Sequence, residues 1–181
     1  PVAACTSIDD DPPGNYAQTV NNVIFNTISS ATSVGTNGVY TDLSCTQKTM
    51  VAAGGTYPLS VTIRAGGSAV ESLNGYIDYN NNGVFEDPSE LVITGSTPTT
   101  NVYATINANV TIPGGAVTNT LLRMRLYGEA GSLSADERNC AATFFVADVE
   151  DYGVYIASNL ASVSIAASPG TTITYGTNVT F

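Results

Sequence analysis

The feature that most constrains this fold is an alternation of apolar and polar residues in short segments along nearly the whole chain. A period of two places apolar side chains on one face of an extended strand, which is the pattern of a half-buried β-strand. Segments rich in glycine, proline and asparagine separate these stretches, as tight turns require. We expect strands at residues 20–28, 57–65, 72–79, 91–94, 102–112, 121–127 and 149–157.

Many short strands at this spacing predict an all-β fold, an antiparallel β-sandwich of the jelly-roll or immunoglobulin-like kind. The pattern changes near residues 157–161. We therefore expect one sandwich over residues 1–157, and a linker with the first strand or strands of an immunoglobulin-like repeat over residues 158–181. Two strands alone are marginal in water, so this last segment either continues into further sequence or is donated to a neighbouring subunit.

The charge of the chain excludes several classes of partner. Fifteen acidic residues against five basic ones give a net charge of −10 and a pI near 4.1. Such a chain repels nucleic acid and anionic lipid, and none of its apolar runs approaches the roughly eighteen residues that a membrane helix needs. Histidine is absent, so the usual Ser-His-Asp and Cys-His nucleophiles cannot be built. We expect a secreted or cell-surface protein that is not an enzyme.

The most specific motif for chemistry begins at Asp78, with Asn80 and Asn82 at alternate positions after it and Gly83 next. In calcium loops these positions supply side-chain oxygens, and the glycine allows the sharp turn that brings the following carbonyl inward. We predict a Ca²⁺ site that joins two strands. Its expected ligands are Asp78, Asn80, Asn82, the backbone oxygen of Val84, and the closing acids Asp87 and Glu90.

Two observations qualify this motif. Position twelve, where an EF-hand carries its closing glutamate, is Ser89, so the segment is not an EF-hand between helices. Asn-Gly is also a strong hairpin signal, so the simpler alternative is a long turn. Four spaced oxygen ligands followed by several acids exceed what a turn needs, which favours the calcium site.

A second group of charged residues lies in two later strands. Arg123 and Arg125 alternate with Leu122, Met124 and Leu126, while Glu150 shares the parity of Tyr152 and its apolar neighbours. A carboxylate that points inward needs a partner. We expect a structural ion pair among Arg123, Arg125, Glu150 and Asp151 rather than a catalytic site, because structural pairs often mimic sites. Asp148 is a further candidate ligand for the calcium ion.

The three cysteines lie far apart in the sequence and form no CxxC motif, which disfavours a zinc site or a redox-active cysteine pair. At most one internal disulfide can form among them. We favour a bond between Cys5 and Cys140, which would leave Cys45 free, although the sequence leaves the other pairings open.

Taken together, these segments resemble the GEVED domain of secreted bacterial, Bacteroidetes-type multidomain proteins. The similarity rests on the run from Tyr76 to Asn80, on Thr111-Ile112-Pro113, on Arg123-Met124-Arg125, on Cys140 and on the segment from Ala147 to Tyr152, all in the family's order. Two departures stand out, since Ala147-Asp148 replaces the name-giving Gly-Glu and Cys45 has no counterpart in the family pattern.

The resemblance implies a non-enzymatic β module. Its expected partners are neighbouring modules of the same protein, with self-assembly into a fibre or adhesin stalk as a further possibility. The alternative is a calcium-dependent carbohydrate-binding module that assists a secreted enzyme, with a glycan platform formed by Tyr76, Tyr79, Tyr103 and Tyr127. Packing of these tyrosines into the sandwich is the simpler interpretation.

Overall fold

The computed structural model describes residues 19–31, 40–67, 69–131 and 147–158. These residues form ten strands and no helix, and so none of them forms a helix long and apolar enough to cross a membrane. The expected all-β fold is confirmed. The strands are β1 (Thr19–Phe25), β2 (Ile28–Ala31), β3 (Tyr40–Asp42), β4 (Lys48–Ala52), β5 (Thr56–Arg64), β6 (Glu71–Ile77), β7 (Leu91–Ser96), β8 (Tyr103–Thr111), β9 (Leu121–Ala130) and β10 (Ala147–Ala157).

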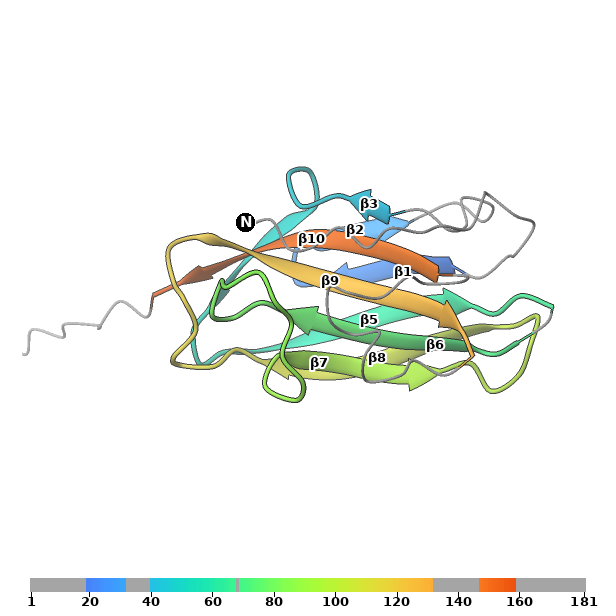
Figure 1. The fold of residues 1–181 in the computed structure, drawn as a ribbon. Coiled ribbons are helices and arrows are strands. Elements are labelled where there is room, and N and C mark those ends of the chain that lie inside the picture. The colour runs from blue at the N-terminus through green and yellow to red at the C-terminus, as the bar shows by residue number, and fades with distance from the viewer. Residues whose placement is uncertain (1–18, 32–39, 68, 132–146, 159–181) are drawn as a thin grey trace, which may run out of the picture.

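The strands form two sheets that pack face to face as a β-sandwich (Figure 1). One sheet has four strands in the order β2-β1-β5-β8, and the other has the order β3-β10-β9-β6-β7 with β4 also paired to β10. The longest strands, β9 and β10, lie side by side near the middle of the six-stranded sheet over nine paired residues. Each sheet therefore brings together strands that are far apart in the sequence.

The six-stranded sheet is mixed rather than purely antiparallel. Both β3 and β4 run parallel to β10, along the same edge and one after the other. The sequence analysis did not include either strand, because segments of three and five residues are too short to show a clear period of two. Their pairing depends on β10, which follows about a hundred residues later in the chain.

The first expected strand is interrupted. Asn26 has a positive φ of 52°, and the chain turns there to form the hairpin between β1 and β2. Asparagine tolerates this left-handed conformation better than most residues, so the turn falls at a residue that permits it. The single stretch 20–28 is therefore the end of one strand and the start of the next.

The core lies between the facing surfaces of the two sheets. Alternate residues of β5 and β9, such as Val61, Ile63, Leu122 and Met124, are fully buried. The cross-strand register places Leu122 opposite Val154, so the even-numbered residues of β9 and β10 share the inner face. The odd-numbered residues of these two strands, which include Arg123, Arg125 and Asp151, occupy the outer face of the six-stranded sheet.

Close packing of this core makes Gly75 a sensitive position. A Cβ atom there would lie 2.6 Å from side-chain atoms of both Ile93 and Leu126, whereas nothing lies within 4 Å of a Cβ at Gly114. We expect Gly75→Ala to lower the free energy of unfolding by about 1–3 kcal/mol through overpacking. Gly114→Ala should change it by less than about 0.5 kcal/mol. Urea denaturation of both variants measures the difference, and equal stabilities would contradict it.

Candidate functional site

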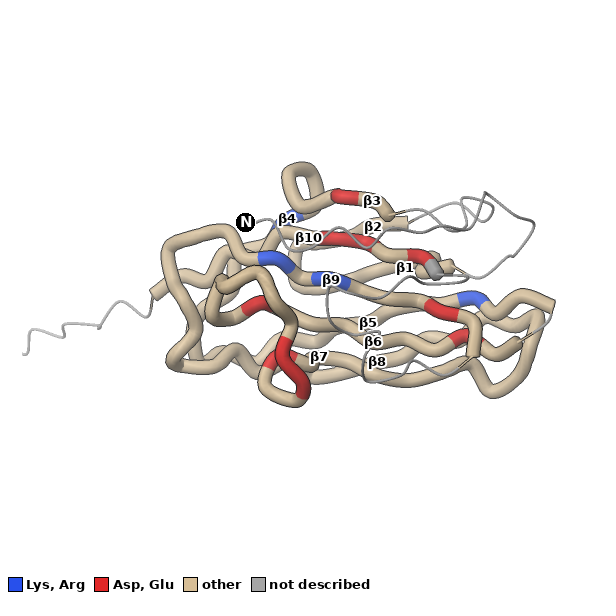
Figure 2. The backbone as a smooth tube through the Cα atoms, viewed as in Figure 1, with Lys and Arg blue, Asp and Glu red and all other residues tan. Residues whose placement is uncertain are grey.

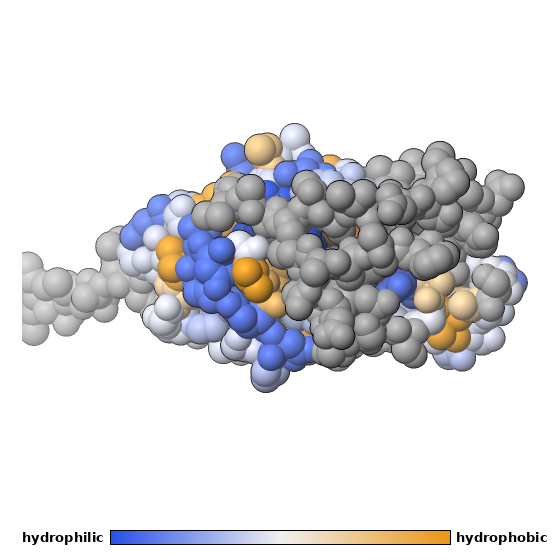
Figure 3. Space-filling view, in the orientation of Figure 1, coloured by the Kyte–Doolittle hydropathy of each residue, from blue (hydrophilic) through white to orange (hydrophobic). Residues whose placement is uncertain are grey.

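The loop between β6 and β7, residues 78–90, is the site that the sequence predicted, and it is held by its own backbone at both ends. The amide of Asp78 donates to the carbonyl of Arg123 on β9, and the amide of Ile77 donates to the carbonyl of Glu90, each at 3.0 Å. Within the loop Asn81 and Gly83 have φ angles of 56° and 85°. The predicted sharp turn at Gly83 is therefore present. Figure 3 shows a hydrophilic band on the surface at this loop.

Three side chains fold inward on the loop backbone at alternate positions. The two carboxylate oxygens of Asp78 accept hydrogen bonds from the amides of Asn82 at 3.1 Å and Gly83 at 2.9 Å. The side-chain oxygen of Asn80 accepts from the amide of Asn82 at 2.9 Å, and that of Asn82 from the amide of Val84 at 2.8 Å. The oxygens of Asp78 and Asn80 thus meet at one amide, and the Asn82 oxygen folds back onto the next turn of the loop.

Two glutamates close the loop. The buried carboxylate of Glu90 accepts from the amides of Tyr79 at 2.7 Å, Asn80 at 3.3 Å and Glu86 at 3.1 Å. The Glu86 carboxylate accepts from the side-chain amides of Asn80 at 3.0 Å and Asn82 at 2.6 Å. Burial and the neighbouring Glu86 raise the pKa of Glu90 to about 7, while hydrogen bonds from Glu90 and Asn82 lower the pKa of Glu86. The carboxyl groups of Glu86 and Glu90 therefore lie close together, and each shifts the pKa of the other.

The expected ligands differ in their surroundings. Asp78 and Glu90 are buried, whereas Asn80, Asn82, Val84 and Asp87 are exposed. Glu86, which the sequence analysis did not select, contacts the side chains of both asparagines. Its position nine in the loop was the available signal, since EF-hand loops also use that position.

The loop has the donors that a hard cation prefers, namely carboxylate, amide and main-chain oxygens. Across the described ranges, no three His, Cys, Asp or Glu side chains are grouped so as to hold a metal by themselves. An ion in this loop would therefore depend on the amide oxygens of Asn80 and Asn82 as well as on carboxylates. The residues present fit calcium on this condition.

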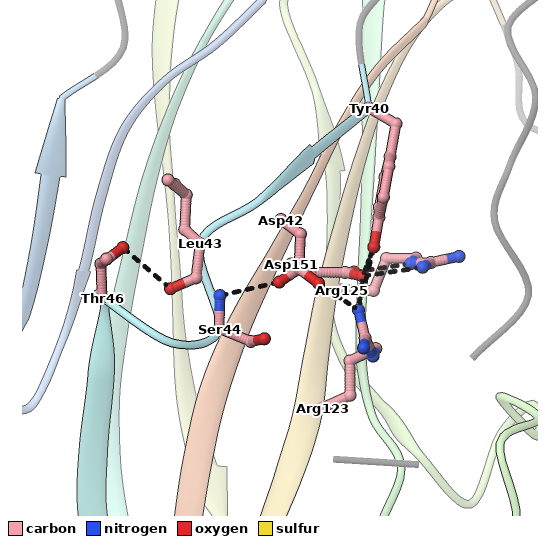
Figure 4. A network of polar contacts seen from close by, with 8 residues as sticks. All are labelled: Tyr40, Asp42, Leu43, Ser44, Thr46, Arg123, Arg125 and Asp151. Carbon is pink, nitrogen blue, oxygen red and sulfur yellow. Dashed lines mark hydrogen bonds and ion pairs between the residues drawn. The ribbon is translucent and has the colours of Figure 1, made fainter. Parts of the chain in front are cut away.

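The outer face of the six-stranded sheet carries the second predicted group, and Asp151 is its centre (Figure 4). The Arg125 guanidinium donates to the two carboxylate oxygens of Asp151 at 2.6 and 2.8 Å, and Arg123 donates to the same carboxylate. The hydroxyl of Tyr40 on β3 also donates to Asp151 at 2.5 Å. Arg123 reaches Asp42 at 3.4 Å. Figure 2 shows the cationic positions of β9 beside the acidic positions of β10.

Arg125 is fully buried and packs against aromatic rings as well as against Asp151. Its guanidinium carbon lies 5.2 Å from the ring centre of Tyr40, 5.4 Å from that of Phe85 and 5.8 Å from that of Tyr127. Burial opposes the charge, but the hydrogen bonds and charge of Asp151 outweigh burial and raise the pKa of Arg125. The guanidinium therefore stays charged inside an aromatic cluster.

Glu150 does not join this network. Its neighbours in sequence alternate across the sheet, so Glu150 lies on the inner face, where it accepts a hydrogen bond from the hydroxyl of Tyr152 at 2.5 Å. Of the two predicted acids, Asp151 contacts both arginines, and Arg123 also pairs with Asp42. Tyr40 and Asp42 complete the network, and sequence reasoning missed them because β3 was not recognised.

Asp148 also lies on the inner face, away from the loop. Its carboxylate accepts from the amide of Val20 on β1 at 2.9 Å, and Asp148 faces Gly128 across the β9–β10 pair. Gly128 faces Leu73 of β6, while the loop follows Ile77 of the same strand. The two places are about 15 Å apart along β6 at roughly 3.3 Å per residue, so Asp148 does not lie with the loop ligands.

Glu71 is a buried acid that the sequence analysis did not select. It is 0% exposed, and neither of its carboxyl oxygens has a hydrogen-bond partner. Burial, then the charges of Asp148 and Glu129, raise the pKa of Glu71 to about 9. Burial and the charge of Glu150 raise the pKa of Asp148 to about 8. The signal was available in the sequence, since Glu71 has the parity of Leu73 and Ile77.

The remaining predicted groups have separate outcomes. Tyr76, Tyr79 and Tyr127 are buried at 0, 7 and 2% exposure, whereas Tyr103 is 55% exposed. Three of the four tyrosines therefore pack into the fold, as the simpler interpretation predicted, and the alternative glycan platform retains Tyr103 alone. Cys45 is a free, exposed thiol. Cys5 and Cys140 lie outside the described residues, as does the segment 162–181.

The family model of the GEVED domain matches residues 72–155, a little under half of the chain. These residues run from β6 into β10 and include the loop, both arginines and Asp151. No curated protein matches the chain.

The Asp151 network predicts a large effect from a small substitution. Asp151→Asn keeps the shape of the side chain but removes the buried charge that both arginines contact, and leaves Arg123 with the more exposed Asp42. We expect it to lower the free energy of unfolding by about 3–5 kcal/mol. Asp42→Asn is the matched control, because the Asp42 side chain is 43% exposed and should contribute less than about 1 kcal/mol. Guanidinium unfolding tests both, and comparable losses would argue against a central role for Asp151.

Glu71 predicts a dependence of stability on pH in metal-free buffer. Its folded pKa of about 9 lies above its ordinary value of 4.5, so the folded state holds a proton that the unfolded state releases. Stability should therefore fall as pH rises between these two values, by at most about 1.4 kcal/mol per pH unit for this group. Glu71→Gln should flatten this slope. Thermal unfolding at intervals from pH 5 to 9 measures it, and parallel curves for the two proteins would refute it.

Proposed function

Residues 72–155 of this chain form a GEVED domain, and we propose that the chain is a non-catalytic, calcium-stabilised β module of a secreted or cell-surface protein. The observation that carries the proposal is that oxygens of Asp78 and Asn80 meet at the amide of Asn82 in the β6–β7 loop, while the Asn82 oxygen folds back onto the Val84 amide. The loop contains four acidic residues and no lysine or arginine. A divalent cation would balance this charge.

The ligands that we propose are Asp78, Asn80, Asn82 and Glu86, together with the backbone oxygen of Val84. Glu86 enters because its carboxylate contacts both asparagine side chains, whereas Asp87 is exposed at the neighbouring position. Glu90 would support the loop from behind through its three backbone amides. Calcium supplies charge neutralisation and a fixed set of oxygen contacts, and no reaction is required of it.

Ordering of this loop would extend to the rest of the outer face. Phe85, in the middle of the loop, is 3% exposed and packs beside Tyr76, with ring centres 5.9 Å apart. The ring of Phe85 also lies against the Arg125 guanidinium. A cation that fixes the loop therefore also fixes one wall of the cluster around Arg125 and Asp151. This coupling supports a structural role for calcium.

We propose that this β module acts in adhesion, or assembles with neighbouring β modules into a fibre. The carbohydrate-binding alternative has less support, because three tyrosines of its platform are buried. A glycan site would have to use Tyr103 without them.

Calcium should bind tightly enough to raise the melting temperature. We expect the wild-type chain to melt several degrees higher in millimolar Ca²⁺ than in EDTA, because an ion that binds only the folded state stabilises it. Asp78→Ala should lose this increment and at least tenfold in loop affinity. Calorimetry of both proteins with and without Ca²⁺ checks it. The same increment in both proteins would exclude the loop as a calcium site.

The two neighbouring acids Glu86 and Asp87 offer a sharper test of the ligand set. Glu86→Gln and Asp87→Asn each remove one negative charge from the loop, so long-range electrostatic effects are matched. We expect Glu86→Gln to weaken Ca²⁺ binding at least tenfold and Asp87→Asn to weaken it less than threefold. Isothermal titration gives both constants. The reverse order would return Asp87 to the ligand set in place of Glu86.

A further inference from the structure

A second group of acids lies at the opposite end of β6 from the loop, on the inner face of the six-stranded sheet. Glu71 and Asp148 converge on Gly128, which belongs to the strand between theirs. The Oε1 atom of Glu71 lies 2.6 Å from the point where a Cβ of Gly128 would be, and the amide nitrogen of Val20 lies 3.7 Å from that point. Asp148 accepts a hydrogen bond from this amide. Only glycine leaves room here for the Glu71 carboxyl group.

The unusual feature of this place is its unsatisfied oxygens. Glu71 is fully buried and both of its carboxyl oxygens lack a hydrogen-bond partner. Buried polar groups are nearly always paired, and an exception needs an explanation. Within the described part of the chain, neither Glu71 nor Asp148 forms an ion pair with a lysine or arginine.

We propose that Glu71 and Asp148 bind a calcium ion at this inner end of the sandwich. Both groups offer hard oxygen donors, which calcium prefers. Glu150 lies on the same face of β10, two residues from Asp148, and adds negative charge, so a divalent ion suits the place better than a monovalent one. The site has two acidic ligands, and no three His, Cys, Asp or Glu side chains in the described ranges are grouped to hold a metal.

This site is distinct from the loop. It joins β1 of the four-stranded sheet to β6 and β10 of the six-stranded sheet, whereas the loop joins β6 to β7 within one sheet. The Asp148 carboxylate accepts from the Val20 amide of the other layer, so an ion held by Asp148 would lie close to the junction of the two sheets. Its loss would leave the Glu71 carboxyl group without a partner, and burial would then favour the protonated form.

The test is the number of calcium ions bound to the full chain, measured by equilibrium dialysis and by calorimetric titration at pH 8. We expect two ions for the wild type, one for Glu71→Gln, one for Asp78→Ala and none for the double variant. Glu71→Gln keeps the size of the side chain and removes a buried charge, so it should fold, which far-UV circular dichroism checks. Asp148→Asn provides a second variant and should also lose one ion.

Glu71→Gln with as many bound ions as the wild type would overturn the proposal. If Glu71→Gln loses one ion and Asp78→Ala loses none, the result supports the calcium site at Glu71. The same result contradicts the calcium site in the β6–β7 loop. The melting temperature adds an independent readout. Without calcium, Glu71→Gln should melt above the wild type at pH 8, and calcium should raise its melting temperature less; the same calcium-induced shift in both proteins would also overturn the proposal.

Discussion

The buried carboxylate of Asp151 is the interaction on which the outer face of this sandwich depends. It lies between two arginines of the neighbouring strand and accepts from Tyr40 of a third strand. A buried charge is costly unless it is paired and hydrogen-bonded, so these residues stabilise the fold only as a set. Because Arg125 also contacts the rings of Phe85 and Tyr127, the set connects the β9–β10 pair to the β6–β7 loop. The charged side chains of Arg123, Arg125 and Asp151 are therefore buried and packed within the fold rather than exposed on its surface.

The acids of the segment that gives the GEVED domain its name divide between the two faces of one strand. Asp148 and Glu150 point toward the four-stranded sheet, and Asp151 points to the outer face. Alternation along β10 thus places one acid in an ion-pair network and two in the interior. The acids of this run therefore take part in two separate sets of contacts, one on each face of β10, rather than in one site. The acids of the inner face, together with Glu71, lie where the two sheets meet.

Much of the site was predictable from local sequence, and the exceptions have physical causes. The loop from Asp78 to Glu90 was recognised as a candidate site because the spacing of its side-chain oxygens is a local pattern, and Gly83 has the positive φ that the motif requires. Glu86, whose carboxylate contacts the side chains of Asn80 and Asn82, was not selected, because the sequence does not tell which of two adjacent carboxylates faces the loop. Glu150, which was predicted in the group with the arginines, lies on the inner face with Tyr152, as its parity in the sequence indicates. Tyr40 could not be found, since its strand is three residues long and pairs with β10 across the sequence.

The sequence by itself determined the strand-rich class, the positions of most strands and the inward or outward parity of each side chain, because these follow from a period of two and from local turn chemistry. The tertiary structure alone decided which strands are neighbours, that β3 and β4 run parallel to β10, and that Glu71 and Asp148 meet over Gly128. Contacts of this kind join residues tens of positions apart. Their energies come from packing and charge pairing between strands, and no local pattern in the chain encodes them.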